Sequence, residues 1–285
     1  MKGFGQWLQQ QKLSGNSINA HIKHIKLFLE WCTMEDQDPV MITYNDLIKY
    51  IQYHRDKGNT KGTTNIRMNS ITRYLNYLIH IKQRKDNPAQ YLRVKKEGRK
   101  MINNLLSPEQ LENLYKDYLN RPEWVITKQS QLKQKRNIIL LGLMIFQGMT
   151  LGELKKLEPG HINLEKSKIY IPATKRSNSR VLNLEGIQVL PLNEYLFQTN
   201  RSGKLFTCNV TNITDWLIKE IRQISGKNIT AKLIRSSVIV GWLKQYNIRQ
   251  VQYMAGHRYI SSTERYRQED ISDLQKQLEL FHPMK

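Results

Sequence analysis

Cysteine is scarce in this sequence, and its two cysteines, Cys32 and Cys208, lie far apart. Neither belongs to a CxxC pair or to a cysteine–histidine cluster. They therefore predict no disulfide framework and no zinc site, and they are typical of a protein of the reducing cytoplasm. No arrangement of aspartate, glutamate and histidine resembles a metal site either. We therefore expect no metal ion.

Long hydrophobic runs are missing as well. The first residues, MKGFGQWLQQQK, lack the apolar core of roughly 7–15 residues that a signal peptide needs. No stretch approaches the roughly 18 apolar residues of a membrane span, and LGLMIF at 141–146 reads as a buried helix segment. The sequence therefore predicts a soluble cytoplasmic protein without a membrane partner.

Acidic residues are too few to balance the basic ones. The chain of 285 residues has 45 Lys and Arg against 24 Asp and Glu, a formal charge of +21. Such a charge predicts attraction to a polyanion, and it favours a nucleic acid over the alternative of a cationic membrane-surface binder. With 39% hydrophobic residues, the chain is long enough for two domains with separate cores.

The first part of the chain predicts an all-helical domain over residues 1–88. Apolar residues recur at helical spacing in segments opening near Ser17, Asn45 and Thr63, with lysines and arginines between them. These basic faces could straddle a duplex, or they could be the solvated surface of a plain helical bundle. Residues 82–100 then hold eight Lys or Arg and two acidic residues, so we place a basic linker at 89–106. The linker could track phosphates or be a solvated tether.

Residues 107–285 predict a mixed α/β domain. Ser107-Pro108-Glu109-Gln110 is a strong helix start, because a serine cap precedes proline at the first helical position. Short β-type runs at 168–174 and 180–184 flank KRSNS, which is a hairpin signal. We expect helices at 135–147, 151–157, 211–224, 231–245 and 248–254, and then a short helix carrying Tyr266. The predicted fold class is mainly α with a small β-sheet or hairpin.

An arginine, a histidine and a tyrosine near the end of the chain suit attack on a DNA phosphate. Arg235 is followed by His257 in MAGHR and, nine residues later, by Tyr266 in STERY. Arginine binds two phosphate oxygens with its planar fork, and tyrosine forms a phosphotyrosyl ester that lets another strand reseal the break. Taken singly, His257 could be a structural histidine and Tyr266 one of 14 tyrosines. Their order and spacing together favour the catalytic interpretation.

At these residues the chain resembles the tyrosine recombinase (lambda-integrase-like) family. Residues 107–270 are similar to its catalytic domain, and the basic helical part before them resembles its core-binding domain. The resemblance implies that Arg235 is the family's second arginine, His257 the histidine of its LGH motif and Tyr266 the nucleophile. Lys175, in the hairpin run ATKRSNSRVLNL, would be the lysine that protonates the departing 5′-hydroxyl, although its neighbour Arg176 could fill that position instead.

Two positions depart from the family pattern. Lys232 stands where the family's H-x-x-R motif has histidine, and a lysine there can still contact phosphate. Thr150, in QGMTLGEL, stands where the motif T-G-L-R-x-x-E-L has the first arginine, while Glu153 matches its acidic residue. Thr150 and Glu153 also predict a capping box that starts the following helix. Lys232 and the hairpin residues Arg176 and Arg180 are candidates for the missing cation.

The resemblance implies a compact, two-domain site-specific recombinase or integrase. Such an enzyme clamps double-stranded DNA between its domains, works through 3′-phosphotyrosines and a Holliday junction, and needs no metal or nucleotide cofactor. It would act as a homo-tetramer on DNA whose tail, residues 271–281, packs on a neighbouring subunit, unless this apolar stripe covers its own domain. The expected setting is a mobile element such as a transposon, an integron-like element or a phage, or else a chromosome-resolution system, and accessory proteins are candidate partners. The alternatives are a non-enzymatic DNA-binding accessory protein that lost the first arginine, and a monomeric topoisomerase-like enzyme.

Overall fold

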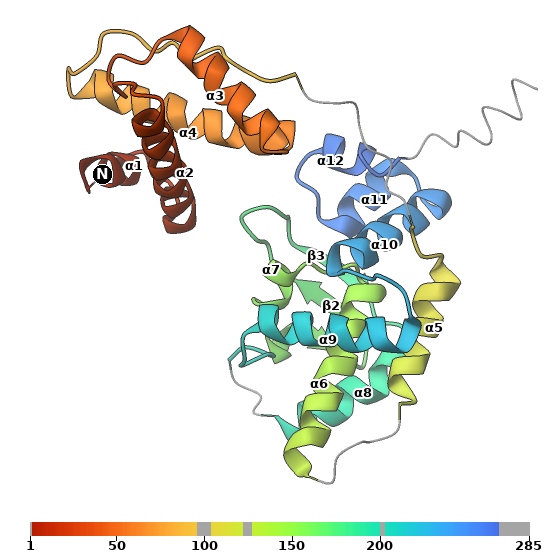
Figure 1. Cartoon of the computed structure of the whole chain (residues 1–285). Helices are drawn as coiled ribbons and strands as arrows, with labels where there is room; N and C mark the ends of the chain where they lie inside the picture. The colour runs from red at the N-terminus through yellow and green to blue at the C-terminus, as the bar shows by residue number, and fades with distance from the viewer. Residues whose placement is uncertain (1, 96–103, 122–126, 200–202, 268–285) are drawn as a thin grey trace, which may run out of the picture. The chain divides into compact units, whose positions relative to one another are not determined.

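Two compact units make up the chain, Met1–Lys100 and Met101–Lys285. The computed structural model describes residues 2–95, 104–121, 127–199 and 203–267 (Figure 1). The division falls within the basic stretch at which the sequence changes composition. Each unit has a hydrophobic core of its own, so each is described separately.

The first unit is a helical domain built on an aromatic core. Its helices are α1 (Lys2–Gln10), α2 (Gly15–Met34), α3 (Tyr44–Asp56) and α4 (Lys61–His80). Phe28, Trp31 and Tyr50 are buried together, with ring centroids 5.0–6.2 Å apart. Hydroxyls of Ser14 and Thr43 accept N–H groups three residues on and start α2 and α3, slightly before the predicted starts. Helix α1 was not predicted from the sequence.

Residues after α4 pack on the first unit rather than forming an extended tether from residue 82. Ala89 and Leu92 are buried in its core. The side chain of Asn65 on α4 accepts from the N–H of Val94 at 2.9 Å and donates to its carbonyl at 2.8 Å. Because this stretch holds many charged residues, its two apolar side chains that fill the core were not recognised from the sequence. The described part of the predicted linker therefore belongs, up to Val94, to the helical unit.

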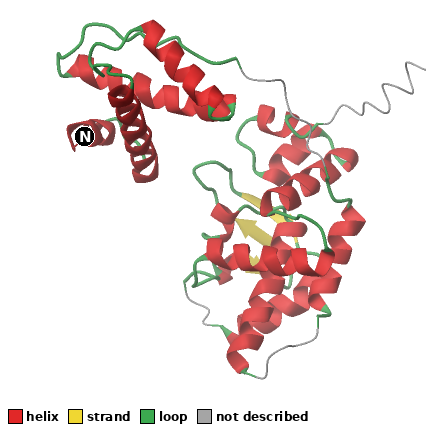
Figure 2. Cartoon of the chain, in the orientation of Figure 1, coloured by secondary structure: helices red, strands yellow, loops and turns green. Residues whose placement is uncertain are grey.

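The second unit surrounds a central helix with further helices and one small sheet (Figure 2). Its helices include α5 (Pro108–Leu119), α6 (Lys128–Ile145), α7 (Leu151–Leu154), a 3₁₀ turn (Pro159–His161), α8 (Gly186–Gln198), α9 (Val210–Ser225), α10 (Ala231–Gln245), α11 (Ile248–Ala255) and α12 (Ile260–Glu264). Helix α6 packs against α5, α8, α9 and α10, and its residues 138–145 are buried. The predicted buried helix segment at 141–146 is confirmed for residues 141–145, although the helix begins earlier than the predicted residue 135. Helix α8, which contains Pro191, was not predicted.

The sheet is antiparallel with strand order β1–β2–β3. It consists of β1 (Ile162–Asn163), β2 (Lys168–Ile171) and β3 (Arg180–Asn183). In β2 and β3, Ile169 pairs with Leu182 and Ile171 pairs with Arg180, so the predicted hairpin is confirmed. The fold class predicted from the sequence, mainly α with a small sheet, is also confirmed. No helix in the described part of the chain is long and apolar enough to cross a membrane.

Candidate active site

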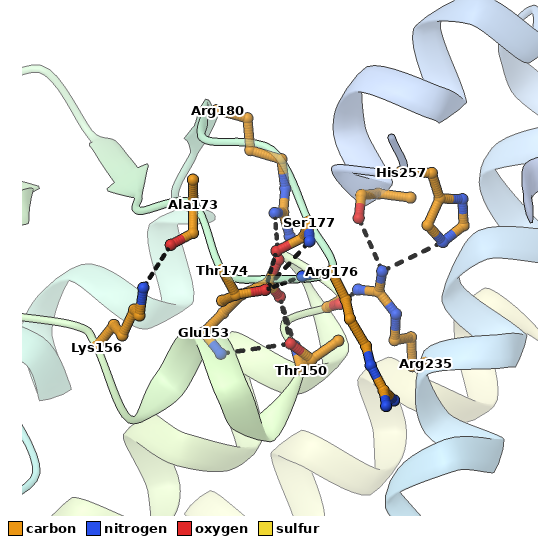
Figure 3. A network of polar contacts seen from close by, with 12 residues as sticks. Thr150, Glu153, Lys156, Ala173, Thr174, Arg176, Ser177, Arg180, Arg235 and His257 are labelled. Atoms are coloured by element: carbon orange, nitrogen blue, oxygen red, sulfur yellow. Dashed lines mark hydrogen bonds and ion pairs between the residues drawn. The ribbon is translucent and has the colours of Figure 1, made fainter. Parts of the chain in front are cut away.

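Arg235 is held by two backbone carbonyls from distant parts of the second unit. It lies on the first turns of α10, which the Thr230 hydroxyl caps by accepting the N–H of Leu233 at 3.0 Å. Its Nη1 donates to the carbonyl of Gly148, and its Nη2 donates to the carbonyl of Ala255 at 2.7 Å (Figure 3). Burial lowers the pKa of Arg235, and the charge of Glu153 opposes that effect. The side chain stays protonated, as arginine does in proteins.

Gly148 brings one of these carbonyls into position. Its φ of 54° is left-handed, a conformation that glycine adopts without steric cost. A Cβ atom here would lie 3.1 Å from the ring of Trp242 and 3.2 Å from Val238, both on α10. The glycine of the QGMT run thus lets the chain turn close against α10, within reach of Arg235.

His257 is a neutral imidazole with a defined tautomer. Helix α11 ends at Ala255 and is capped by Gly256, whose φ is 68°, and His257 follows. Its Nε2 lies 3.4 Å from Arg235 Nη2, and its Nδ1 lies 2.9 Å from the hydroxyl of Thr263. Because a guanidinium can only donate, Nε2 is the acceptor and Nδ1 carries the hydrogen that is donated to Thr263. Burial, followed by the charges of Arg235 and Arg180, lowers the pKa of His257 to about 4.

Tyr266 lies next to His257. The two rings stack with centroids 5.8 Å apart and planes 13° from parallel. The Tyr266 side chain also packs on a small cluster that contains Ile239 and Val251, and it is half-buried. Tyr266 follows α12 by two residues, so the prediction that a short helix carries it was wrong by that margin. Its N–H donates to the carbonyl of Thr263 at 2.9 Å, which closes a turn after α12.

Thr150 and Glu153 form the predicted capping box at the start of α7. Glu153 Oε2 accepts the N–H of Thr150 at 2.7 Å and its hydroxyl at 2.9 Å, while the N–H of Glu153 donates to that hydroxyl at 3.4 Å. The one hydroxyl hydrogen of Thr150 is therefore already donated. Glu153 Oε1 in turn accepts from Nη1 of Arg180 at 2.6 Å, and both side chains of this ion pair are fully buried (Figure 3).

The β2–β3 hairpin loop, which carries Lys175, is attached to the turn that carries His257. Ser177 forms an isolated β-bridge with His257, and the N–H of Asn178 donates to the carbonyl of Gly256 at 2.9 Å. Arg258 Nη2 donates to the carbonyl of Thr174 at 3.1 Å. Lys175 is exposed in this loop.

The structure thus brings Arg235, His257 and Tyr266 together. It places Thr150 in the capping box that starts α7, and it leaves Lys232 exposed on α10, one turn before Arg235. Thr263, which accepts the Nδ1 hydrogen of His257, was not predicted from the sequence, and no sequence signal distinguishes this threonine. Nor could the sequence show that the acidic residue of the QGMTLGEL run binds Arg180. The described residues hold no group of three or more His, Cys, Asp and Glu side chains suited to a metal ion.

Comparison with known proteins decides the family, because residues 104–272, more than half of the chain, match the model of the phage integrase family. The chain belongs to the phage integrase family. It is 24% identical over 294 residues to a tyrosine recombinase XerD from Oceanobacillus iheyensis, covering 96% of this chain and 94% of the relative. A tyrosine recombinase XerA from Pyrococcus horikoshii is 22% identical, with 98% and 92% covered.

Solved structures share the fold of this phage integrase family member. A Tn1549 transposon integrase in complex with a circular intermediate DNA superposes with a TM-score of 0.67 at 13% identity, covering 98% of each chain. A lambda integrase dimer bound to a COC′ core site superposes with a TM-score of 0.64 at 14% identity, covering 94% of this chain and 93% of that one. At these identities the likeness establishes the fold.

Proposed function

We propose that this member of the phage integrase family is a site-specific DNA recombinase. It cuts and rejoins DNA strands through a 3′-phosphotyrosine intermediate and passes through a Holliday junction. The observation that carries the proposal is the convergence of Arg235, His257 and Tyr266, which come from separate elements and meet through direct contacts. A cation, an imidazole and a phenol in contact are what transfer of a phosphoryl group to tyrosine requires.

Each side chain has a role in this reaction. The Tyr266 oxygen attacks the scissile phosphorus while its phenol proton passes to the neutral imidazole of His257, and the bond from phosphorus to the 5′-oxygen breaks. Arg235 binds non-bridging oxygens, because its guanidinium presents several donors in one plane. Lys175 in the hairpin loop gives a proton to the departing 5′-hydroxyl, and Lys232 adds positive charge one turn from Arg235. Thr150 supports the site through Glu153 rather than by donating to phosphate.

The assembly follows from the same chemistry. Exchange between two DNA sites requires four tyrosines, so a homo-tetramer on DNA is the proposed active form, with residues 271–281 joining neighbouring subunits. The first unit, helical and basic, would hold the duplex beside the cleavage point as a core-binding domain. The Tn1549 and lambda neighbours support DNA as the partner and a mobile element as the setting. Accessory proteins would fix the direction of exchange.

A suicide substrate tests the function. This is a nicked duplex, taken from the element that encodes the protein, in which cleavage releases a short fragment and traps the protein on DNA. We expect a covalent protein–DNA band on a denaturing gel with wild-type protein and none with Tyr266→Phe. Tight DNA binding without a band, together with a band from Thr150→Arg, would contradict the enzyme and indicate an accessory DNA-binding protein.

A further inference from the structure

Arg180 is a fully buried arginine with unused hydrogen-bonding capacity. It is the first residue of β3, opposite Ile171, and its side chain is 0% exposed. Nη1 donates to Glu153, whereas Nε and Nη2 are buried without a hydrogen-bond partner among the described residues. Burying unpaired N–H groups costs free energy, so such an arrangement requires a reason.

The hydrogen bonds that Glu153 accepts do not explain the unpaired N–H groups of Arg180. Its Oε1 is satisfied by a single N–H of Arg180, and its Oε2 by the backbone and hydroxyl of Thr150. Burial opposes ionisation of Glu153, but the hydrogen bond and charge of Arg180 outweigh it and hold the pKa of the carboxyl below its ordinary value. The carboxylate is therefore charged and anchors the guanidinium, while the remaining N–H groups of Arg180 stay unexplained.

The guanidinium lies against the turn that carries His257. A Cβ atom on Gly256 would be 2.4 Å from Nη1 of Arg180 and 3.0 Å from its Cζ. The charge of Arg180 also contributes, after burial and Arg235, to the low pKa of His257. Arg180 therefore acts electrostatically on the imidazole that faces Arg235.

We propose that Arg180 is a positioning residue for strand transfer: anchored by Glu153, it supplies a fixed positive charge behind Arg235 and His257. The inference rests on the proposed function. Negative charge develops on the phosphoryl oxygens during the attack, and a preorganised cation in a water-excluded site stabilises it without reorganisation. Thr150 carries no charge, and its hydroxyl hydrogen is bound to Glu153, so the nearby cation on β3 meets this need.

The test compares two substrates and a matched pair of variants. Glu153→Gln/Arg180→Gln replaces the ion pair by neutral amides and leaves no buried charge unpaired. Arg180→Gln alone leaves the carboxylate of Glu153 buried without its cation. Arg121→Gln is the control, because Arg121 forms another ion pair, with Glu220 at 3.1 Å, away from the site. The substrates are suicide duplexes with either a normal scissile phosphate or an uncharged methylphosphonate, and the rate of covalent complex formation is measured.

We expect the double variant to cleave the phosphate substrate roughly 10- to 100-fold more slowly than wild type, less than the loss typical of a donor that touches the oxyanion. On methylphosphonate, which has less charge to stabilise, the ratio of the wild-type rate to the double-variant rate should fall towards one. Arg121→Gln should not alter the cleavage rate of either substrate. Equal slowing on both substrates, or no slowing on phosphate, would overturn the role of Arg180. Wild-type protein without a Tyr266-dependent band would overturn the proposed function with it.

Discussion

Arg235 and Arg180 carry like charges in one site, and the partners of each explain how both are accommodated. The hydrogen bonds of Arg235 go to the carbonyls of Gly148 and Ala255, which carry no net charge, so its charge remains for a ligand. Arg180 is paired with the buried carboxylate of Glu153. His257, between such charges, stays neutral. Without DNA the cluster is therefore positively charged, which suits the binding of one phosphodiester anion.

The protonation of His257 is directly testable. Burial, Arg235 and Arg180 lower its pKa to about 4. In the unfolded chain a histidine titrates near about 6.5, so the unfolded state binds more protons, and folding stability falls as the pH drops from about 6.5 towards 4. We expect the imidazole NMR signals of His257, assigned by comparison with His257→Gln, to stay constant between about pH 7.5 and 5.5. A titration midpoint near the ordinary value would contradict the buried, neutral ring.

Gly256 offers a second test at the residue scale. Alanine here must adopt a left-handed φ of 68° and would bring its Cβ within 2.4 Å of Arg180. Gly226 is a matched control, because it ends α9 with a φ of 65° and has open space around it. Both alanine variants lose about 1–2 kcal/mol for the left-handed conformation. Urea unfolding should show a further loss of about 1–3 kcal/mol for Gly256→Ala alone. Equal losses would mean that Arg180 does not pack against this turn.

At the scale of elements, the segment after α4 packs on the first unit, and this packing distinguishes it from an extended tether. Leu92 is 9% exposed and lies in the core of the first unit, whereas its neighbour Tyr91 is 88% exposed. Leu92→Ala should lower the free energy of unfolding by about 2 kcal/mol or more, because it leaves a cavity. Tyr91→Ala should change it by less than about 0.5 kcal/mol. Urea unfolding, with hydrogen exchange to show which unit opens, measures both. Similar small effects would support an extended linker from residue 82.

Local signals predicted the elements that have local causes. The capping box at Ser107 and Gln110 starts α5 where expected, and the alternating run before KRSNS forms β2. Helix α8 was missed because Pro191 reads as a helix breaker, yet tertiary packing on α6 holds the helix together. The candidate site was predicted as a set of residues, but not as a set of contacts.

These contacts could not be read from the sequence because they join residues far apart in it. Arg235 reaches the carbonyl of Gly148, 87 residues earlier, and Arg180 reaches Glu153, 27 residues earlier. Each contact depends on how α7, the hairpin and α10 pack together, which no local pattern encodes. Comparison with the family pattern identified Thr150 as a departure. Only the structure shows that the hydroxyl of Thr150 is bound to Glu153.

At the scale of the whole molecule, the proposed recombination involves several copies of the chain, and residues 271–281 are the segment proposed to join them. Ile271, Leu274, Leu278 and Phe281 recur at helical spacing and lie outside the described residues. Leu274→Glu/Leu278→Glu places charges on this stripe, and Gln275→Glu/Gln277→Glu adds the same charge beside it. If the stripe packs on a neighbouring subunit, burying a carboxylate there is costly, so the leucine variant should fail to join two DNA sites.

Sedimentation of the protein with duplex sites measures the assembly, and the suicide substrate measures cleavage. For the leucine variant we expect single-site complexes in place of tetramers on paired sites, with the melting temperature and binding to one site unchanged. The glutamine variant should assemble as wild type does. A leucine variant that melts several degrees lower, and loses binding to single sites as well, would show instead that the stripe covers its own domain. A charged side chain then disrupts the fold before any assembly takes place.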